Sequence, residues 1–221
     1  EFSDIQNNHW LSLFDVDRSC ILDPLTQPLP FTPFKDFTGR SINEINLYST
    51  EMSSALCSID RVSASANMNN RLSEAIVEAY KSTNGAPISF ELMLKCYQSR
   101  MKDANNDDSI SSVLKQLVNA HIFESEDKVS LIDDSYIIKM DGYPKDGPIA
   151  KAIVYFLMSK LNNIYELLDK QAVNDEVVQI RHFSIIDEAH YMLDFDNRPL
   201  RNLIAVGRNK GLSIILATQN M

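Results

Sequence analysis

Two adjacent carboxylates follow an apolar stretch near the C-terminal end of the sequence. Residues 183–190 read FSIIDEAH, so Asp187 and Glu188 come directly after a short segment that is typical of a β-strand. A carboxylate in the place of Asp187 can hold the water shell of Mg²⁺ on a nucleotide. A second carboxylate, such as Glu188, can polarise an attacking water as a general base. The alternative is a strand that ends in two solvated acids before a turn.

A second stretch carries polar side chains of a complementary kind. Residues 207–219 read GRNKGLSIILATQ, which is a basic helix end, a glycine and an apolar strand that finishes in Thr-Gln. We expect Gln219 to reach the γ-phosphate or the attacking water from the tip of this strand, and His190 to contact the γ-phosphate. Arg208 is predicted to stabilise charge on the transferring phosphate, in its own chain or in a neighbouring subunit. The alternatives are a solvated strand end for Gln219, a helix start for His190 and a favourable helix C-terminal charge for Arg208.

The elements around these residues alternate between strand and helix. Strands are predicted over residues 135–141, 181–186 and 212–217, with helices over 148–170 and 197–210. Residues 171–179 are polar and are expected to be mobile. This order is typical of a parallel sheet with crossover helices. Asp187 and Glu188 would then lie at the tip of a buried central strand, at the edge where such sheets bind ligands.

The first half of the chain has a different character. Residues 1–40 contain one short strand, ending near Leu22, and a proline-rich connection. Residues 41–123 show apolar positions at helical spacing, with Ser41 and Glu44 at the spacing of a capping box. We therefore predict three parts: a core segment over 1–40, an all-helical insert over 41–123, and the remaining core over 124–221.

Composition excludes several classes of protein. The net charge is −9, which argues against a broad basic face for binding DNA in this segment. The three cysteines, Cys20, Cys57 and Cys96, are scattered and lack the spacing of a zinc site or a disulfide framework. Together with the absence of a signal peptide and of a run of about 20 apolar residues, this favours a cytoplasmic location.

The two C-terminal stretches together resemble the Walker B and sensor motifs of the HerA/FtsK superfamily. Residues 21–34, ILDPLTQPLPFTPF, are similar to the strand and proline-rich exit that follow the nucleotide loop there, and residues 135–161 resemble the strand and helix before Walker B. The resemblance implies an α/β fold: a partial RecA-like P-loop NTPase parallel sheet with an all-helical insert. It also implies ATP and Mg²⁺ as cofactors, with Mg²⁺ held by Asp187 through water, and a hexameric ring that moves double-stranded DNA.

The superfamily includes HerA-type translocases and the ATPases of conjugation and type IV secretion. A similarity to DptH-like restriction ATPases implies phage defence, with a nuclease or other defence-system partner. Two alternatives remain: a degenerate ATPase domain that serves as a structural or regulatory subunit, and a DEAH-type helicase. Helicases of that type carry Ser-Ala-Thr after DEAH, whereas residues 217–219 read ATQ.

The phosphate-binding loop G-x-x-x-x-G-K-[ST] does not occur in the sequence. Gly142 and Gly147 have the separation of its glycines, but Pro148 and Ile149 stand in place of the lysine and hydroxyl residue. Residues 142–147 are therefore interpreted as a plain strand-to-helix turn. The terminal Glu1-Phe2 is what an EcoRI cloning site encodes. We expect the chain to be a piece cut after its phosphate loop, with poor ATP binding and no turnover of its own.

Overall fold

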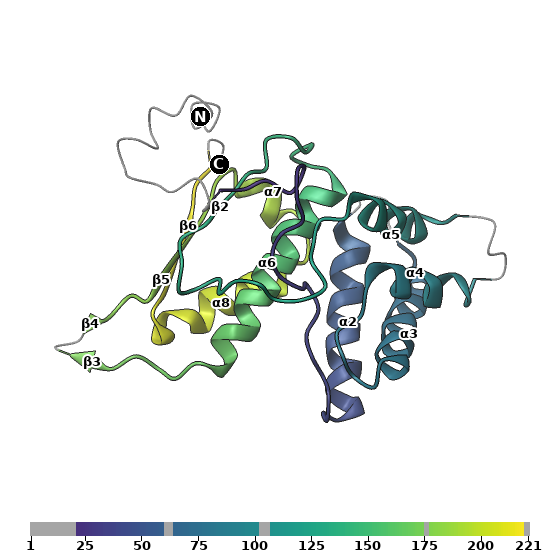
Figure 1. Ribbon diagram of the computed structural model, residues 1–221, viewed down its shortest axis with the longest axis horizontal. Coiled ribbons are helices and arrows are strands. Elements are labelled where there is room, and N and C mark those ends of the chain that lie inside the picture. The colour runs from purple at the N-terminus through teal and green to yellow at the C-terminus, as the bar shows by residue number, and fades with distance from the viewer. Residues whose placement is uncertain (1–20, 60–63, 102–106, 175–176, 219–221) are drawn as a thin grey trace.

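The computed structural model describes residues 21–59, 64–101, 107–174 and 177–218. Its helices are α2 (Ile42–Ile59), α3 (Ala66–Ser82), α4 (Phe90–Gln98), α5 (Ser109–Ala120), α6 (Pro148–Leu167), α7 (His190–Leu193), α8 (Arg198–Val206) and the 3₁₀ helix η3 (Gly207–Lys210). Its strands are β1 (Ile21–Leu22), β2 (Ile137–Ile138), β3 (Val173–Asn174), β4 (Val177–Val178), β5 (His182–Ile186) and β6 (Leu212–Leu216). Figure 1 shows α2 to α5 gathered at one end of the molecule, with α6 and α8 between them and the β3–β4 hairpin.

Side-chain caps start the helices of the helical block, α2 to α5. Ser41 and Glu44 cap α2 reciprocally: the Glu44 amide donates to Ser41 Oγ at 3.4 Å, and the Ser41 amide donates to Glu44 Oε2 at 3.0 Å. Asp108 and Ser111 form the same kind of capping box at α5. Each cap satisfies amides that the first turn of a helix leaves without partners. The block therefore begins its helices where the local sequence signals place them.

The strands form parallel pairs, as expected, but in two separate sheets. Ile21 pairs with Ile137 in the β1–β2 sheet, and Ile186 pairs with Leu216 in the β5–β6 sheet. Within the described ranges no strand joins the two pairs, so the expectation of one continuous sheet is wrong there. The strand expected over 135–141 is reduced to two residues. The Lys139 amide donates to the Leu22 carbonyl, and the chain after β1 then turns at Asp23, so among the described residues β2 has no strand partner beyond this bond.

The stretch 171–179 contains two short strands that the sequence analysis did not predict. β3 and β4 pair antiparallel, with Val173 opposite Val178. The valines are β-branched and favour extended backbone, which outweighs the polar residues around them. β3 and β4 lie beyond the N-terminal end of β5 (Figure 1). These strands were not predicted because two-residue strands leave too little pattern to detect.

Gly211 sets the point at which β6 begins. It ends η3 with a φ of +82°, a left-handed value that disfavours other residues. A Cβ at this position would lie 2.8 Å from the Gln179 carbonyl oxygen. The Gly211 carbonyl accepts from the Arg181 and His182 amides, so this turn also fixes the start of β5. The two strands are thereby aligned from the same point.

Helix α6 ties the helical block to the strands. It packs against α8 on one side and against α2 and α5 on another. Its Phe156 is fully buried, in contact with aromatic rings from the block. Lys210 Nζ donates to the carbonyls of Tyr165 at 2.6 Å and Glu166 at 3.0 Å, which satisfies the C-terminal end of α6. No helix of the described ranges, α6 included, is long and apolar enough to cross a bilayer.

Candidate functional site

The two carboxylates lie at the carboxyl end of a parallel strand pair. Asp187 and Glu188 directly follow β5, whose last residue, Ile186, pairs in register with Leu216 of β6. The Ala217 amide donates to the Ile186 carbonyl at 2.9 Å, and the Ala189 amide donates to the Ala217 carbonyl at 2.8 Å. These bonds fold the segment after β5 onto the end of β6. The edge formed in this way is where open α/β sheets bind ligands.

Strand β5 is buried on one face only. Its inward side chains include His182, whose pKa is lowered by burial, and Ile186, which is buried. Its outward side chains, Phe183 and Ile185, are 56% and 67% exposed, and Ile215 of β6 beside them is 44% exposed. Within the described ranges β5 pairs only with β6. The prediction of a buried central strand is therefore wrong for the outward face, because no described element packs on it.

The backbone of Glu188 and the side chains of Lys145 and His190 define where its carboxylate lies. Its φ is +52°, a left-handed value that is uncommon outside glycine and is often found at functional sites. Its amide donates to Asp187 Oδ1 at 2.9 Å. One carboxylate oxygen, Oε1, lies 3.3 Å from Lys145 Nζ, and the other, Oε2, lies 3.5 Å from His190 Nδ1. With its side chain 21% exposed, Glu188 is partly shielded from solvent.

His190 links the ends of the two strands. It is the first residue of α7, which agrees with the helix start that we considered for it. Its Nδ1 lies 3.2 Å from Thr218 Oγ1, just beyond β6, and 3.5 Å from Glu188 Oε2. Its ring lies 4.1 Å from that of Tyr191. The structure therefore brings Glu188, His190 and Thr218 together, with both neighbours facing the same ring nitrogen of His190.

Asp187 is suited to a magnesium ion that arrives with a nucleotide. Its carboxylate is exposed at the strand end, and one of its oxygens, Oδ1, accepts from the Glu188 amide. In the described part of the chain no three His, Cys, Asp or Glu residues gather to form a metal site of their own. Magnesium is commonly held by one or two carboxylates together with phosphate oxygens and water. The donor set at Asp187 fits that arrangement.

Arg208, another predicted catalytic residue, is not brought to this edge. Arg208 lies in η3, before β6, whereas Glu188 lies beyond the other end of the strand pair. Five residues of parallel strand span about 13 Å, so Arg208 is remote from Glu188 within one chain. It borders a groove of about 500 Å³ between β4, α8 and β6. Gln219 lies outside the described residues.

Lys145 is the member of this site that sequence reasoning missed. It lies between β2 and α6, 43 residues before Glu188, in the stretch that we interpreted from the sequence as a plain turn. The available signal was its position: the turn follows a strand that precedes β5 in the alternating order, so a basic residue there can approach the same edge. Spacing along the chain alone does not reveal the contact.

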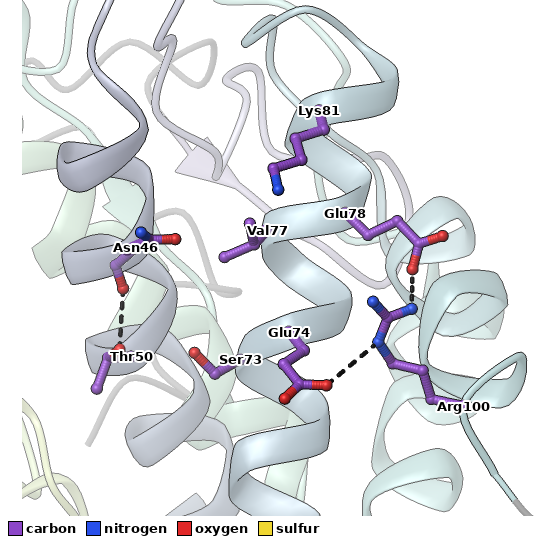
Figure 2. A pocket seen from close by; sticks show the side chains of 8 residues that line it. All are labelled: Asn46, Thr50, Ser73, Glu74, Val77, Glu78, Lys81 and Arg100. Atoms are coloured by element: carbon purple, nitrogen blue, oxygen red, sulfur yellow. Dashed lines mark hydrogen bonds and ion pairs between the residues drawn. The ribbon is translucent and has the colours of Figure 1, made fainter.

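A second hollow lies in the helical block, far along the chain from the carboxylates. Figure 2 shows it lined by side chains of α2, α3 and the residue Arg100 that follows α4. Arg100 forms ion pairs with Glu74, at 3.6 Å, and with Glu78. Lys81 also lines this cavity of about 460 Å³, so its two acidic and two basic side chains offset each other. It lacks the strand-end carboxylates of a nucleotide site. We therefore place the functional site at the end of β5 and β6.

A solved structure of VirB4 from Thermoanaerobacter pseudethanolicus is similar to this chain. The likeness covers 95% of this chain and 58% of the VirB4 chain, with a TM-score of 0.57 and 14% sequence identity. The likeness is one of fold: small parallel sheets and helices arranged as in part of the VirB4 chain. No protein-family model matches the sequence, and no curated protein matches it either.

Proposed function

We propose that this chain forms part of the ATP-hydrolysing core of a motor that moves double-stranded DNA. The observation that carries the proposal is the position of Asp187 and Glu188 at the carboxyl end of β5, in register beside β6. The fold similarity to VirB4, a type IV secretion ATPase, supports the same assignment. Conjugation, secretion and phage defence are the settings in which such a motor acts.

Each residue of the site has a proposed role in this reaction. Asp187 holds Mg²⁺ through its water shell, and Glu188 polarises the water that attacks the γ-phosphate. ATP would supply the phosphoryl group, and the magnesium bound to it would neutralise part of the negative charge on the phosphates. His190 orients Glu188 and contacts the γ-phosphate, since it lies 3.5 Å from one Glu188 oxygen. Gln219 follows Thr218 in the sequence and is proposed to sense the γ-phosphate.

A ring assembly accounts for the position of Arg208. The residue lies at the opposite end of β6 from Glu188, so it cannot serve the site of its own chain without a large movement. In a hexameric ring it would instead stabilise phosphate charge in the site of a neighbouring subunit. The net charge of −9 is compatible with DNA contacts by a few residues in the pore rather than by a broad basic face.

The remaining parts of such a motor are proposed to lie elsewhere in the natural protein. The chain spans 58% of the length of the VirB4 chain it resembles. Its own turn over residues 142–147 lacks the lysine and hydroxyl of a phosphate loop. A second candidate, favoured by that missing loop, is a degenerate ATPase domain with a structural or regulatory role. The two candidates differ in whether the full-length protein hydrolyses ATP.

The test compares ATP hydrolysis by the full-length natural protein and by this chain alone. We expect the full-length protein to hydrolyse ATP faster in the presence of double-stranded DNA, and the isolated chain to show no hydrolysis above background. A full-length protein that neither binds nor hydrolyses ATP would support the structural role instead. Separation of DNA strands by the full-length protein would favour the DEAH-type helicase.

A further inference from the structure

We infer that Lys145 is a positioning residue that holds the Glu188 carboxylate in a resting position until nucleotide phosphate draws the lysine away. The inference rests on the proposed function, in which Glu188 is the general base. It adds a regulatory contact between the β2–α6 turn and the end of β5. Residues 43 positions apart are joined by this contact, with Lys145 Nζ 3.3 Å from Glu188 Oε1.

The turn that carries Lys145 is defined by its own hydrogen bonds. The Tyr143 amide donates to the Met140 carbonyl at 3.1 Å, and the Gly147 amide donates to the Pro144 carbonyl at 2.9 Å. These two bonds fold the backbone on both sides of Lys145. The lysine side chain itself is 59% exposed and can change its rotamer at little cost. The backbone of Lys145 is therefore fixed, whereas its ammonium group can move.

The two carboxylate oxygens of Glu188 face different neighbours. Oε1 faces Lys145 Nζ, and Oε2 lies 3.5 Å from His190 Nδ1. A general base must accept a hydrogen bond from the attacking water within about 3 Å of its oxygen. Lys145 Nζ therefore occupies one of the directions from which that water could approach Oε1.

Bound nucleotide offers Lys145 a stronger partner. The γ-phosphate carries more negative charge than a single carboxylate, and a lysine ammonium binds phosphate as a point charge. Asp187, the proposed magnesium residue, precedes Glu188 directly, so phosphate held there would lie close to the Lys145–Glu188 pair. Movement of Lys145 to the phosphate would leave Glu188 Oε1 free. The same lysine would then contribute to nucleotide binding.

The size of the effect follows from the exposure of the pair. An ion pair with a largely exposed lysine stabilises one position only weakly and therefore shifts the population of Glu188 positions by about two- to fivefold. We expect Lys145→Met in the full-length protein to raise DNA-free ATP turnover, kcat, by that factor. The KM for ATP should rise as well, because the phosphate loses a contact. General damage to the fold would instead lower kcat.

Three variants make the measurement specific. Lys145→Arg keeps a cation at this position and should remain close to the wild type in both constants. Lys145→Met in a Glu188→Gln background should leave the residual turnover unchanged, since no base remains to be released. Lys128→Met is the matched control: Lys128 has a side chain 58% exposed and pairs with Glu124 at 2.8 Å, away from the site.

The outcomes separate this inference from the proposed function. If Glu188→Gln hydrolyses ATP like the wild type, Glu188 is not the base, and both ideas fail. If Glu188→Gln is inactive but Lys145→Met leaves kcat unchanged or lowers it, the proposed function stands and the role of Lys145 is wrong. A rise in kcat for Lys145→Met that also occurs in Lys128→Met would likewise overturn it.

Discussion

Glu188→Gln is expected to lower ATP turnover by the full-length protein by about 10²- to 10⁴-fold, the range that general bases contribute. The amide has the same shape as the carboxylate but cannot take up the proton of the attacking water. Nucleotide binding should change little, because the proposed magnesium residue, Asp187, is intact. The measurement pairs steady-state hydrolysis with equilibrium binding of a fluorescent ATP analogue.

The matched control is Glu126→Gln. Glu126 is exposed and lies in the segment between α5 and β2, so its loss should leave turnover within about twofold of the wild type. Turnover by Glu188→Gln within twofold of the wild type would remove Glu188 from the role of base. Loss of nucleotide binding together with turnover would indicate a folding or binding defect rather than a catalytic one.

Phe156→Ala is expected to reduce the free energy of unfolding by about 3–5 kcal/mol, the usual cost of removing a fully buried phenylalanine. Phe156 has no exposed surface and joins α6 to the helical block. Its ring lies 5.3 Å from that of Phe90 and 5.7 Å from those of Phe34 and Phe123. All three contacts are edge-to-face, the geometry that aromatic pairs prefer. Urea denaturation of the variant and the wild type measures the difference.

Leu167→Ala on the same helix is the control for this substitution. Leu167 is 82% exposed, so its truncation should change the free energy of unfolding by no more than about 0.5 kcal/mol. A loss below about 1.5 kcal/mol for Phe156→Ala would mean that the aromatic cluster does not hold α6 to the block. In that case the helical block and the strand region would be expected to unfold separately.

Features governed by neighbouring residues could be predicted from the sequence. The cap of α2 depends on Ser41 and Glu44, three residues apart, and both of its backbone bonds are present. The parallel pairing of β5 with β6 followed from the strand, helix, strand order around Arg198–Val206. The position of Asp187 after β5 followed from the apolar stretch before it. Each of these depends on a local pattern.

Features governed by contacts between distant segments could not be predicted. Nothing in the spacing of Lys145 and Glu188 indicates that their side chains meet across 43 residues. The exposure of Ile185 depends on which elements cover β5, whereas its apolar character alone had indicated a buried strand. The β3–β4 hairpin escaped detection because each strand has only two residues. The first two failures share one cause: local spacing and apolar character do not indicate which distant side chains or surfaces meet.

The most direct test of the central claim is a crystal structure of the full-length protein with Mg²⁺ and a non-hydrolysable ATP analogue. The claim is that nucleotide is processed where Asp187 and Glu188 follow β5. It predicts a magnesium ion whose inner-shell water contacts the Asp187 carboxylate, which places the metal about 4 Å from a carboxylate oxygen. The γ-phosphate should lie next to Glu188. An analogue bound instead in the groove beside Arg208, or in the helical block, would contradict the claim.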